Sequence, residues 1–130
     1  MKTIIIIIFI LVIASAAMAP MLPKCWAVQK GKVHIRKMLV TAYCPCHLCC
    51  GSAACGITAS GYKIKPADKL LAAPPEIPFE TAIFVPGYGR AKVKDRGGKI
   101  QGDRLDVYFG LHIEALKWGR QELEVTIYDN

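Results

Sequence analysis

Short segments of alternating apolar and polar residues, separated by glycine and proline turns, constrain this chain most strongly. Such alternation is expected of strands that bury one face. The segments that fit are KVHIRKMLVTAY (32–43), TAIFVPGYG (81–89, ending in a Pro-Gly turn), RAKVKD (90–95), LDVYF (105–109) and LEVTIY (123–128). Helical spacing is found in HIEALKWG (112–119), with Ile113 and Leu116 on one side and Gly119 as the stop. The pattern predicts an all-β domain: a small closed barrel with one short helix.

The alternation also predicts which side chains share a face of each strand. In LDVYF, Asp106 and Tyr108 lie opposite an apolar face of Leu105, Val107 and Phe109. The other apolar faces are expected to be Val33, Ile35, Leu39 and Thr41 in the first strand, and Ala91 with Val93 in RAKVKD. Asp106 is thus expected on the side of its strand that does not face the apolar core.

The first nineteen residues have the pattern of a secretory signal peptide. Lys2 precedes a dense apolar run from Ile4 to Ile13, and small residues follow it. An uncleaved membrane anchor is the alternative, because a spanning helix needs about 20 apolar residues. Either interpretation predicts export to the wall, periplasm or medium. We expect a signal at 1–19, an N-terminal arm at 20–32 and the barrel domain at 33–130.

The net charge of +7 favours anionic partners. The basic residues are scattered rather than clustered, which argues against a nucleic-acid groove. For an exported protein, anionic lipid or an acidic wall polymer is the better fit. We therefore expect no nucleic-acid partner, and contact with a membrane only through the N-terminal segment if it stays uncleaved.

Five of the six cysteines crowd into CPCHLCC and the residues just after it, and Cys25 stands apart in the arm. Disulfides are the favoured interpretation for an exported domain of this size. A zinc site is a second one; it would use Cys46 and Cys49 with Cys44, His47 or Cys55. A redox Cys-X-X-Cys motif is a third, although the expected βαβ setting is missing. His34, His47 and His112 show no partner pattern, and we expect them at the surface or in loops.

Asp95 and Asp106 stand eleven residues apart in KDRGGKIQGDRLDVYFG. A carboxylate within an apolar β segment costs free energy unless it is hydrogen-bonded, paired or kept for chemistry. Gly97, Gly98 and Gly102 between them would let the backbone approach a ligand closely. The alternative is that both aspartates only accept hydrogen bonds from turn backbone, as aspartates beside glycines often do.

An ordered set of motifs resembles the 3D domain, which is named for three aspartates and shared with the MltA-type lytic transglycosylases. The motifs are TAYCP (41–45), GITASG (56–61), IP (77–78), VPGYG (85–89), DRGGKIQG (95–102), RLDVYF (104–109) and EALKWG (114–119). The resemblance implies a six-stranded double-psi β-barrel. It also implies cleavage of the β-1,4 bond between N-acetylmuramic acid and N-acetylglucosamine in peptidoglycan glycan strands.

The resemblance assigns roles to individual residues. Asp106 takes the position of the catalytic aspartate and Asp95 that of its partner. To donate a proton near neutrality, Asp106 needs its pKa raised from about 3.9 to about 6, by burial or a like charge. The expected substrate-binding residues are Tyr43, Thr58, Ser60, Gly97 and Gly98. We expect a monomer and no cofactor or metal in the reaction.

The sequence departs from the 3D pattern at two positions. Ala73 stands where the third aspartate precedes the Pro-X-X-Ile-Pro segment, and Glu80 stands where glycine is usual. Neither Glu76 nor Glu80 occupies the position of the missing carboxylate. The alternative to an enzyme is therefore a non-catalytic wall-binding or wall-loosening module on the same barrel. A disulfide-rich interaction protein, such as a phage or secreted accessory factor, is a further alternative.

Overall fold

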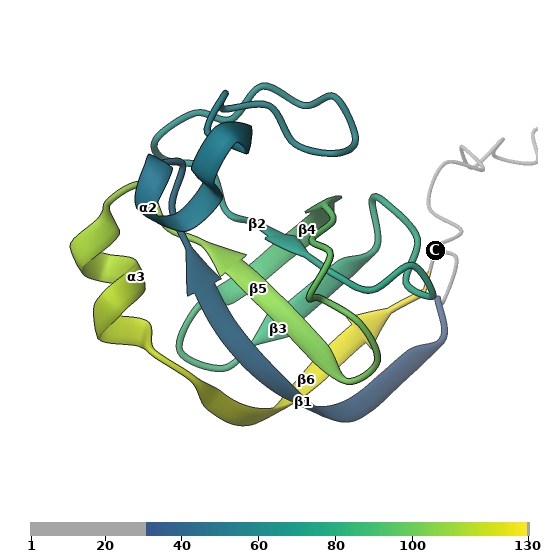
Figure 1. Cartoon of the computed structure of the whole chain (residues 1–130). Coiled ribbons are helices and arrows are strands. Elements are labelled where there is room, and N and C mark those ends of the chain that lie inside the picture. The colour runs from purple at the N-terminus through teal and green to yellow at the C-terminus, as the bar shows by residue number, and fades with distance from the viewer. Residues whose placement is uncertain (1–30, 130) are drawn as a thin grey trace, which may run out of the picture. The chain divides into compact units, whose positions relative to one another are not determined.

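The computed structural model describes residues 31–129, so the predicted signal and most of the predicted arm lie outside the described residues. Six strands close into a barrel (Figure 1). They are β1 (Val33–Tyr43), β2 (Leu70–Ala72), β3 (Ala82–Val85), β4 (Gly89–Asp95), β5 (Arg104–Tyr108) and β6 (Gln121–Tyr128). The predicted small six-stranded barrel is confirmed.

The strands follow the order β1-β5-β2-β4-β3-β6 around the barrel. β1 runs parallel to β5, and β2 runs parallel to β4, whereas the other neighbours are antiparallel. Because β1 and β5 are parallel and Tyr43 lies opposite Tyr108, both strands end at the same edge. The segments that follow them therefore start side by side.

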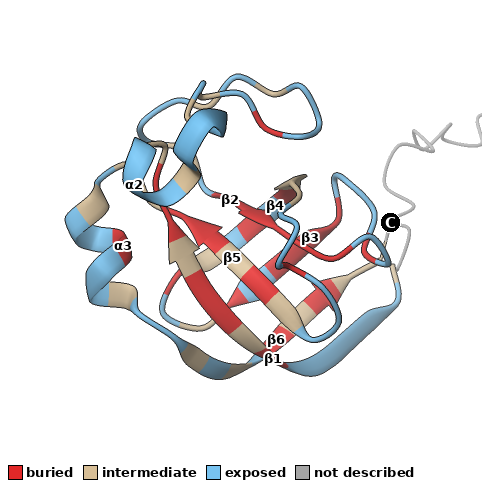
Figure 2. Ribbon diagram, viewed as in Figure 1, coloured by how far each residue is buried: buried red, intermediate tan, exposed pale blue. Residues whose placement is uncertain are grey.

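Apolar side chains from all six strands fill the barrel interior. Figure 2 shows where buried residues lie along the ribbon. Leu105 and Val107 of β5 and Val93 of β4 have no exposed area. Ala91 is buried beside them, and Phe109 packs against the same cluster. The apolar faces predicted for RAKVKD and LDVYF are thus confirmed.

The face predicted for the start of β1 is wrong. Val33 and Ile35 are exposed by 53% and 72%, and Met38 and Val40 are buried instead. The physical reason is the pairing. Residues 33–38 pair only with β6, whereas β5 joins β1 from Leu39 onward. The first half of β1 therefore lies beyond the closed part of the barrel.

The helix expected near the C-terminus is present as α3 (His112–Trp118). Its predicted apolar positions, Ile113 and Leu116, are exposed, and Ala115 is the buried residue. Two short turns occur where the sequence predicted loop: α2 (His47–Cys50) and η2 (Gly51–Ala53). The short strand β2 was also missed. None of the helices in residues 31–129 is long and apolar enough to cross a membrane.

Residues 44–69, which we call the outer loop, connect β1 to β2 and include α2 and η2. A second apolar cluster, formed by Tyr43, Leu70 and Tyr108, lies outside the main interior cluster. Tyr62 and Ile64 of the outer loop pack against it. The outer loop thus covers the face of β5 that carries Tyr108 and Asp106, opposite the barrel interior.

Candidate functional site

A pocket of about 540 Å³ lies between the outer loop and the ends of the strands. Six of the seven predicted site residues line it: Tyr43, Thr58, Asp95, Gly97, Gly98 and Asp106. Ser60 lies one contact away, with its hydroxyl 3.0 Å from that of Thr58. Residues from four separate segments of the sequence are therefore brought together.

The strand register explains why the two aspartates meet. Ala72 on β2 pairs with Asp106 on one side and with Asp95 on the other. Thr41 on β1 pairs with Asp106 in turn. Residues at matching register positions on adjacent strands are neighbours. Thr41, Asp106, Ala72 and Asp95 thus form a row across four strands, with an alanine separating the carboxylates.

Asp95 is held by three hydrogen-bond donors. Its Oδ1 accepts the backbone N–H of Ala59 at 2.8 Å and that of Arg96 at 2.9 Å, and its Oδ2 accepts the hydroxyl of Tyr43 at 2.9 Å. The contacts come from β1, the outer loop and the residue after β4. Asp95 therefore has a fixed orientation and ties the outer loop to the barrel.

Asp106 is bound more lightly. The Thr41 hydroxyl donates to its Oδ1 at 2.8 Å, and among the described residues no donor reaches Oδ2. Burial raises the pKa of Asp106, and the negative charge of Asp95 adds to the rise, while the Thr41 hydrogen bond and the positive charge of Arg104 oppose it. The direction of this shift is the one that a general acid needs near neutrality.

Tyr43, which we expected to bind substrate, has its ring buried. Only 8% of it is exposed, and its ring packs edge-on against Tyr108 at a centroid distance of 5.7 Å. Burial, followed by the charge of Asp95, raises the pKa of the Tyr43 hydroxyl, so it remains a donor. These contacts favour a positioning role toward Asp95.

The predicted glycines differ in what they allow. A Cβ on Gly97 would lie 2.9 Å from Cγ1 of Ile100, so packing requires glycine there. A Cβ on Gly98 would meet nothing within 4 Å. Gly98 therefore leaves open space beside the pocket, as a ligand-binding backbone position would require.

The two departures from the 3D pattern have separate consequences. Ala73 is fully buried in the interior cluster, whereas its neighbour Ala72 lines the pocket. Glu80 has a φ of 69°, a conformation that favours glycine, and its carboxylate pairs with Lys92 and Lys94. Glu80 is not among the pocket residues. The pocket therefore holds two carboxylates, not three.

Sequence reasoning missed three contributors to the site. Thr41 was expected on the apolar face, yet it donates to Asp106. The sequence gives no signal for the contact from the Ala59 N–H to Asp95, because almost any residue can supply a backbone donor. Arg96 lines the pocket and donates to the carbonyl oxygens of Ala73 and Ile77 at 3.1 and 2.7 Å. A basic residue directly after Asp95 was the available signal.

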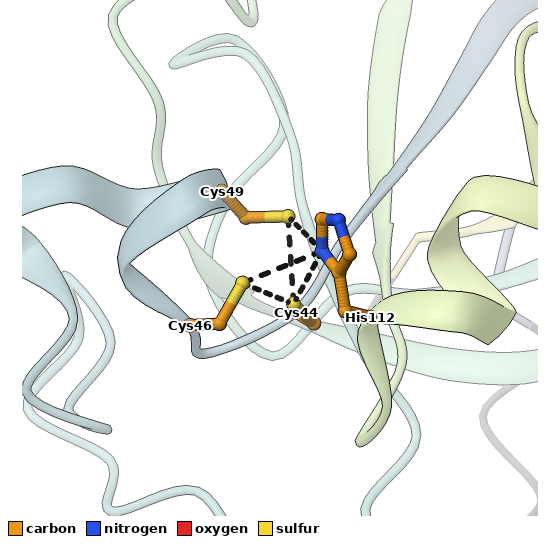
Figure 3. A group of neighbouring side chains, drawn as sticks. All are labelled: Cys44, Cys46, Cys49 and His112. Atoms are coloured by element: carbon orange, nitrogen blue, oxygen red, sulfur yellow. Dashed lines mark hydrogen bonds between the residues drawn. The ribbon is translucent and has the colours of Figure 1, made fainter.

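Cys44, Cys46, Cys49 and His112 converge at the edge where β1 and β5 end (Figure 3). Their ligand atoms all lie within 4.8 Å of one another. The surface or loop position expected for His112 is therefore corrected: it opens α3 and faces three thiols. The five cysteines within residues 31–129 are free, so the predicted disulfides are not confirmed. Cys25 lies outside the described residues.

Two relatives from Bacillus subtilis (strain 168) resemble this chain. The cell wall-binding protein YocH is 35% identical over 75 residues, which is 55% of this chain and 26% of YocH. The putative cell wall shaping protein YabE is 35% identical over 89 residues, which is 67% of this chain and 21% of YabE. The chain thus spans about a quarter or less of the length of these relatives.

The 3D domain family matches residues 69–129. This range begins just before β2 and contains both pocket aspartates and all of the last five strands. The barrel and the matched range agree with the motifs in the sequence. The chain therefore carries a 3D domain.

Proposed function

We propose that this protein acts on the bacterial cell wall by cleaving the β-1,4 bond between N-acetylmuramic acid and N-acetylglucosamine in peptidoglycan. The observation that carries the proposal is the pair of unlike carboxylates in one pocket. Asp106 is half-buried with a raised pKa, and nothing within residues 31–129 donates to its Oδ2, whereas Asp95 is fixed by three donors. Glycoside cleavage requires such an acid beside the leaving oxygen.

In this proposal Asp106 serves first as acid and then as base. Its proton passes to the glycosidic oxygen as the bond from C1 of N-acetylmuramic acid breaks. The 6-hydroxyl of the same sugar bonds to C1, and its proton returns to Asp106. The product is a 1,6-anhydro end, and no water is consumed. One carboxyl group therefore suffices for the chemistry, which a pocket with two carboxylates can supply.

Asp95 and Arg96 would orient the sugar. Ala72 pairs with Asp95 on one side and Asp106 on the other, so the two carboxylates are near neighbours. The negative charge of Asp95 raises the pKa of Asp106. The Arg96 side chain brings a positive charge to the pocket wall, where the carboxylates of a muramic acid or peptide stem would be attracted. Export to the wall, with the signal at 1–19 and the domain at 33–130, is part of this proposal.

Binding without cleavage is the second candidate function. The name of one relative, a cell wall-binding protein, favours it. The pocket, the net positive charge and the 3D domain would serve this role equally. The two candidates differ in one respect: only the enzyme needs the carboxyl group of Asp106.

The test compares Asp106→Asn with the parent and with Asp103→Asn on purified peptidoglycan sacculi. Asp103 is an exposed turn residue that pairs with Arg36 outside the pocket, so it controls for the same change of side chain. We expect release of soluble muropeptides to fall by about 100-fold or more in Asp106→Asn, the usual loss on removing a general acid. Asp103→Asn should equal the parent.

Two results would count against cleavage. Equal release by Asp106→Asn and the parent would remove Asp106 from the mechanism. Sedimentation of the parent with sacculi but no release of fragments would leave the binding function. The assay therefore measures both bound protein and released fragments in every sample.

A further inference from the structure

Cys44, Cys46, Cys49 and His112 bring four potential metal ligands within 4.8 Å of one another. His112 Nδ1 lies 3.4 Å from the sulfur of each cysteine. A tetrahedral zinc ion, with Zn–S bonds of about 2.3 Å and a Zn–N bond of about 2.0–2.1 Å, would set that nitrogen about 3.5 Å from each sulfur. The three nitrogen–sulfur distances match this arrangement. The sulfur–sulfur distances, 2.9 Å from Cys44 to Cys46 and 3.4 Å from Cys44 to Cys49, are shorter than the roughly 3.8 Å that the same ion would set, so binding would move these sulfurs apart.

Hydrogen bonding does not account for the cluster. An imidazole nitrogen offers one lone pair or one hydrogen, so it can serve one of the three thiols and not all three. The sulfur of Cys44 is also 2.9 Å from that of Cys46 and 3.4 Å from that of Cys49. A cation at the centre would satisfy all four groups at once.

We propose that Cys44, Cys46, Cys49 and His112 bind a zinc ion as a structural site. Three thiolates and one imidazole are an established structural zinc donor set, and they leave no position open for substrate or water. The soft sulfur ligands favour zinc over calcium or magnesium, which take oxygen ligands. This inference is independent of the proposed glycan cleavage.

The fold explains how ligands so distant in sequence meet. Cys44 comes directly after Tyr43, the last residue of β1. His112 comes four residues after Tyr108, the last residue of β5. These strands are parallel neighbours that end together, and the N–H of Phe109 donates to the carbonyl of Tyr43 at 2.8 Å beyond them. His112 thus supplies the ligand from a separate segment that structural zinc sites usually require.

The α2 turn brings the other two sulfurs into place. The N–H groups of Cys49 and Cys50 both donate to the carbonyl of Cys46, at 3.1 and 2.9 Å. This turn directs the Cys46 and Cys49 side chains toward Cys44, as Figure 3 shows. A disulfide could use two of the three thiols and would leave the third and His112 without a role.

The zinc ion would fix one wall of the pocket. Cys49 lines the pocket together with Cys50, Ala53 and Cys55 of the same short segment. This segment has few buried residues, so it lacks an apolar core of its own. Zinc would join it to α3 and the end of β1.

The test measures metal in the full chain, purified from zinc-supplemented medium and passed through a chelator column. Elemental analysis should give one zinc ion per chain in the parent, and Co²⁺ in its place should give the intense visible absorption of a tetrahedral thiolate site. Cys46→Ser and His112→Ala should lose the bound zinc. His47→Ala and Cys55→Ser are the matched controls and should keep it, because neither residue belongs to the cluster.

Cys46→His is a second variant for the case in which Cys46→Ser does not fold. Histidine is also a zinc ligand, so this variant should retain the ion. Two results would overturn the proposal. One is a parent without zinc whose mass under non-reducing conditions shows a disulfide within Cys44, Cys46 and Cys49. The other is unchanged zinc content in both His112→Ala and Cys46→Ser, which would place the ion elsewhere.

Discussion

The barrel interior and the outer loop are two regions of this protein that reach order by different means. In the interior, Leu105, Val107 and Val125 are completely buried among apolar neighbours. In the outer loop, Leu48 and Ile57 are exposed by 84% and 55%. The interior can be stabilised by the hydrophobic effect, whereas the outer loop has the small apolar contact of Tyr62 and Ile64 and depends further on polar contacts and, in our proposal, on zinc.

The pocket lies where these regions meet, and each supplies a different part of it. The strands place Asp106 and Thr41 through the register of β5 with β1. The outer loop supplies Thr58 and the N–H of Ala59. The Asp106 carboxyl group is thus attached to the barrel, and the covering wall belongs to the region with the smaller apolar core.

Leu105→Ala should have the largest effect on stability. It removes a fully buried side chain from the interior and should lower the free energy of unfolding by about 2–5 kcal/mol. Denaturant unfolding monitored by circular dichroism measures this. Leu116→Ala is the control: this leucine is 61% exposed, and its loss should change stability by less than about 0.5 kcal/mol. An equal decrease in the free energy of unfolding in both variants would show that burial of Leu105 in the interior does not stabilise the barrel.

Removal of zinc should affect the outer loop and spare the interior. With a chelator, amide hydrogen exchange between Cys46 and Cys55 should accelerate, because α2 loses its tie to α3. Amides of β5 should keep their protection. Mass spectrometry of peptides from both regions gives the comparison, and His112→Ala should be insensitive to chelator. Faster exchange throughout the barrel would contradict the separation of the two regions.

Tyr43→Phe tests the hydrogen bond that joins the regions. It removes one of three donors to Asp95 and should cost about 1.5–3 kcal/mol of stability, as expected for a hydrogen bond to a charged group. Release of muropeptides should fall as well. Tyr62→Phe is the matched control. The Tyr62 hydroxyl donates to Asp68 over a distance of 2.9 Å, and neither residue lines the pocket. This control should leave release unchanged; a fall equal to that of Tyr43→Phe would argue against a specific role for Asp95.

Asp106→Asn should raise stability slightly at neutral pH. The folded protein raises the pKa of Asp106 above 3.8, so the folded state binds the proton more tightly than the unfolded state does. The stabilisation that this tighter proton binding gives the folded state is fully present below the unfolded pKa and is lost as pH rises through the folded pKa. Asparagine cannot ionise, so the variant does not lose stability in this pH range. Thermal unfolding should therefore favour the variant at pH 7, with the difference vanishing below pH 3.8; a variant less stable at pH 7 would contradict the raised pKa.

Much of the barrel and most of the pocket could be predicted from the sequence. Alternation located β4 and β5 and separated Asp106 from the Leu105 face. It failed for Val33 and Ile35, because alternation does not reveal where along a strand the barrel closes. The strand β2 has three consecutive buried residues and no alternation, so it carried no periodic signal.

The remaining parts of the site depend on tertiary contacts that no local pattern encodes. The approach of His112 to the cysteines requires the parallel pairing of β1 with β5, which joins segments more than 60 residues apart. Ala59 contributes through its backbone. Tyr43 lines the pocket, but its ring packs edge-on against Tyr108, and no local pattern predicts that contact.

The most direct test of the account is the chemical identity of the glycan ends released from purified sacculi by the parent protein. Mass analysis distinguishes a 1,6-anhydro end from a reducing end, which is heavier by one water molecule. We predict 1,6-anhydro N-acetylmuramic acid ends, formed through Asp106 without activated water. Reducing ends would contradict the transglycosylase mechanism, and the absence of any new ends would show that the pocket binds glycan without cutting it.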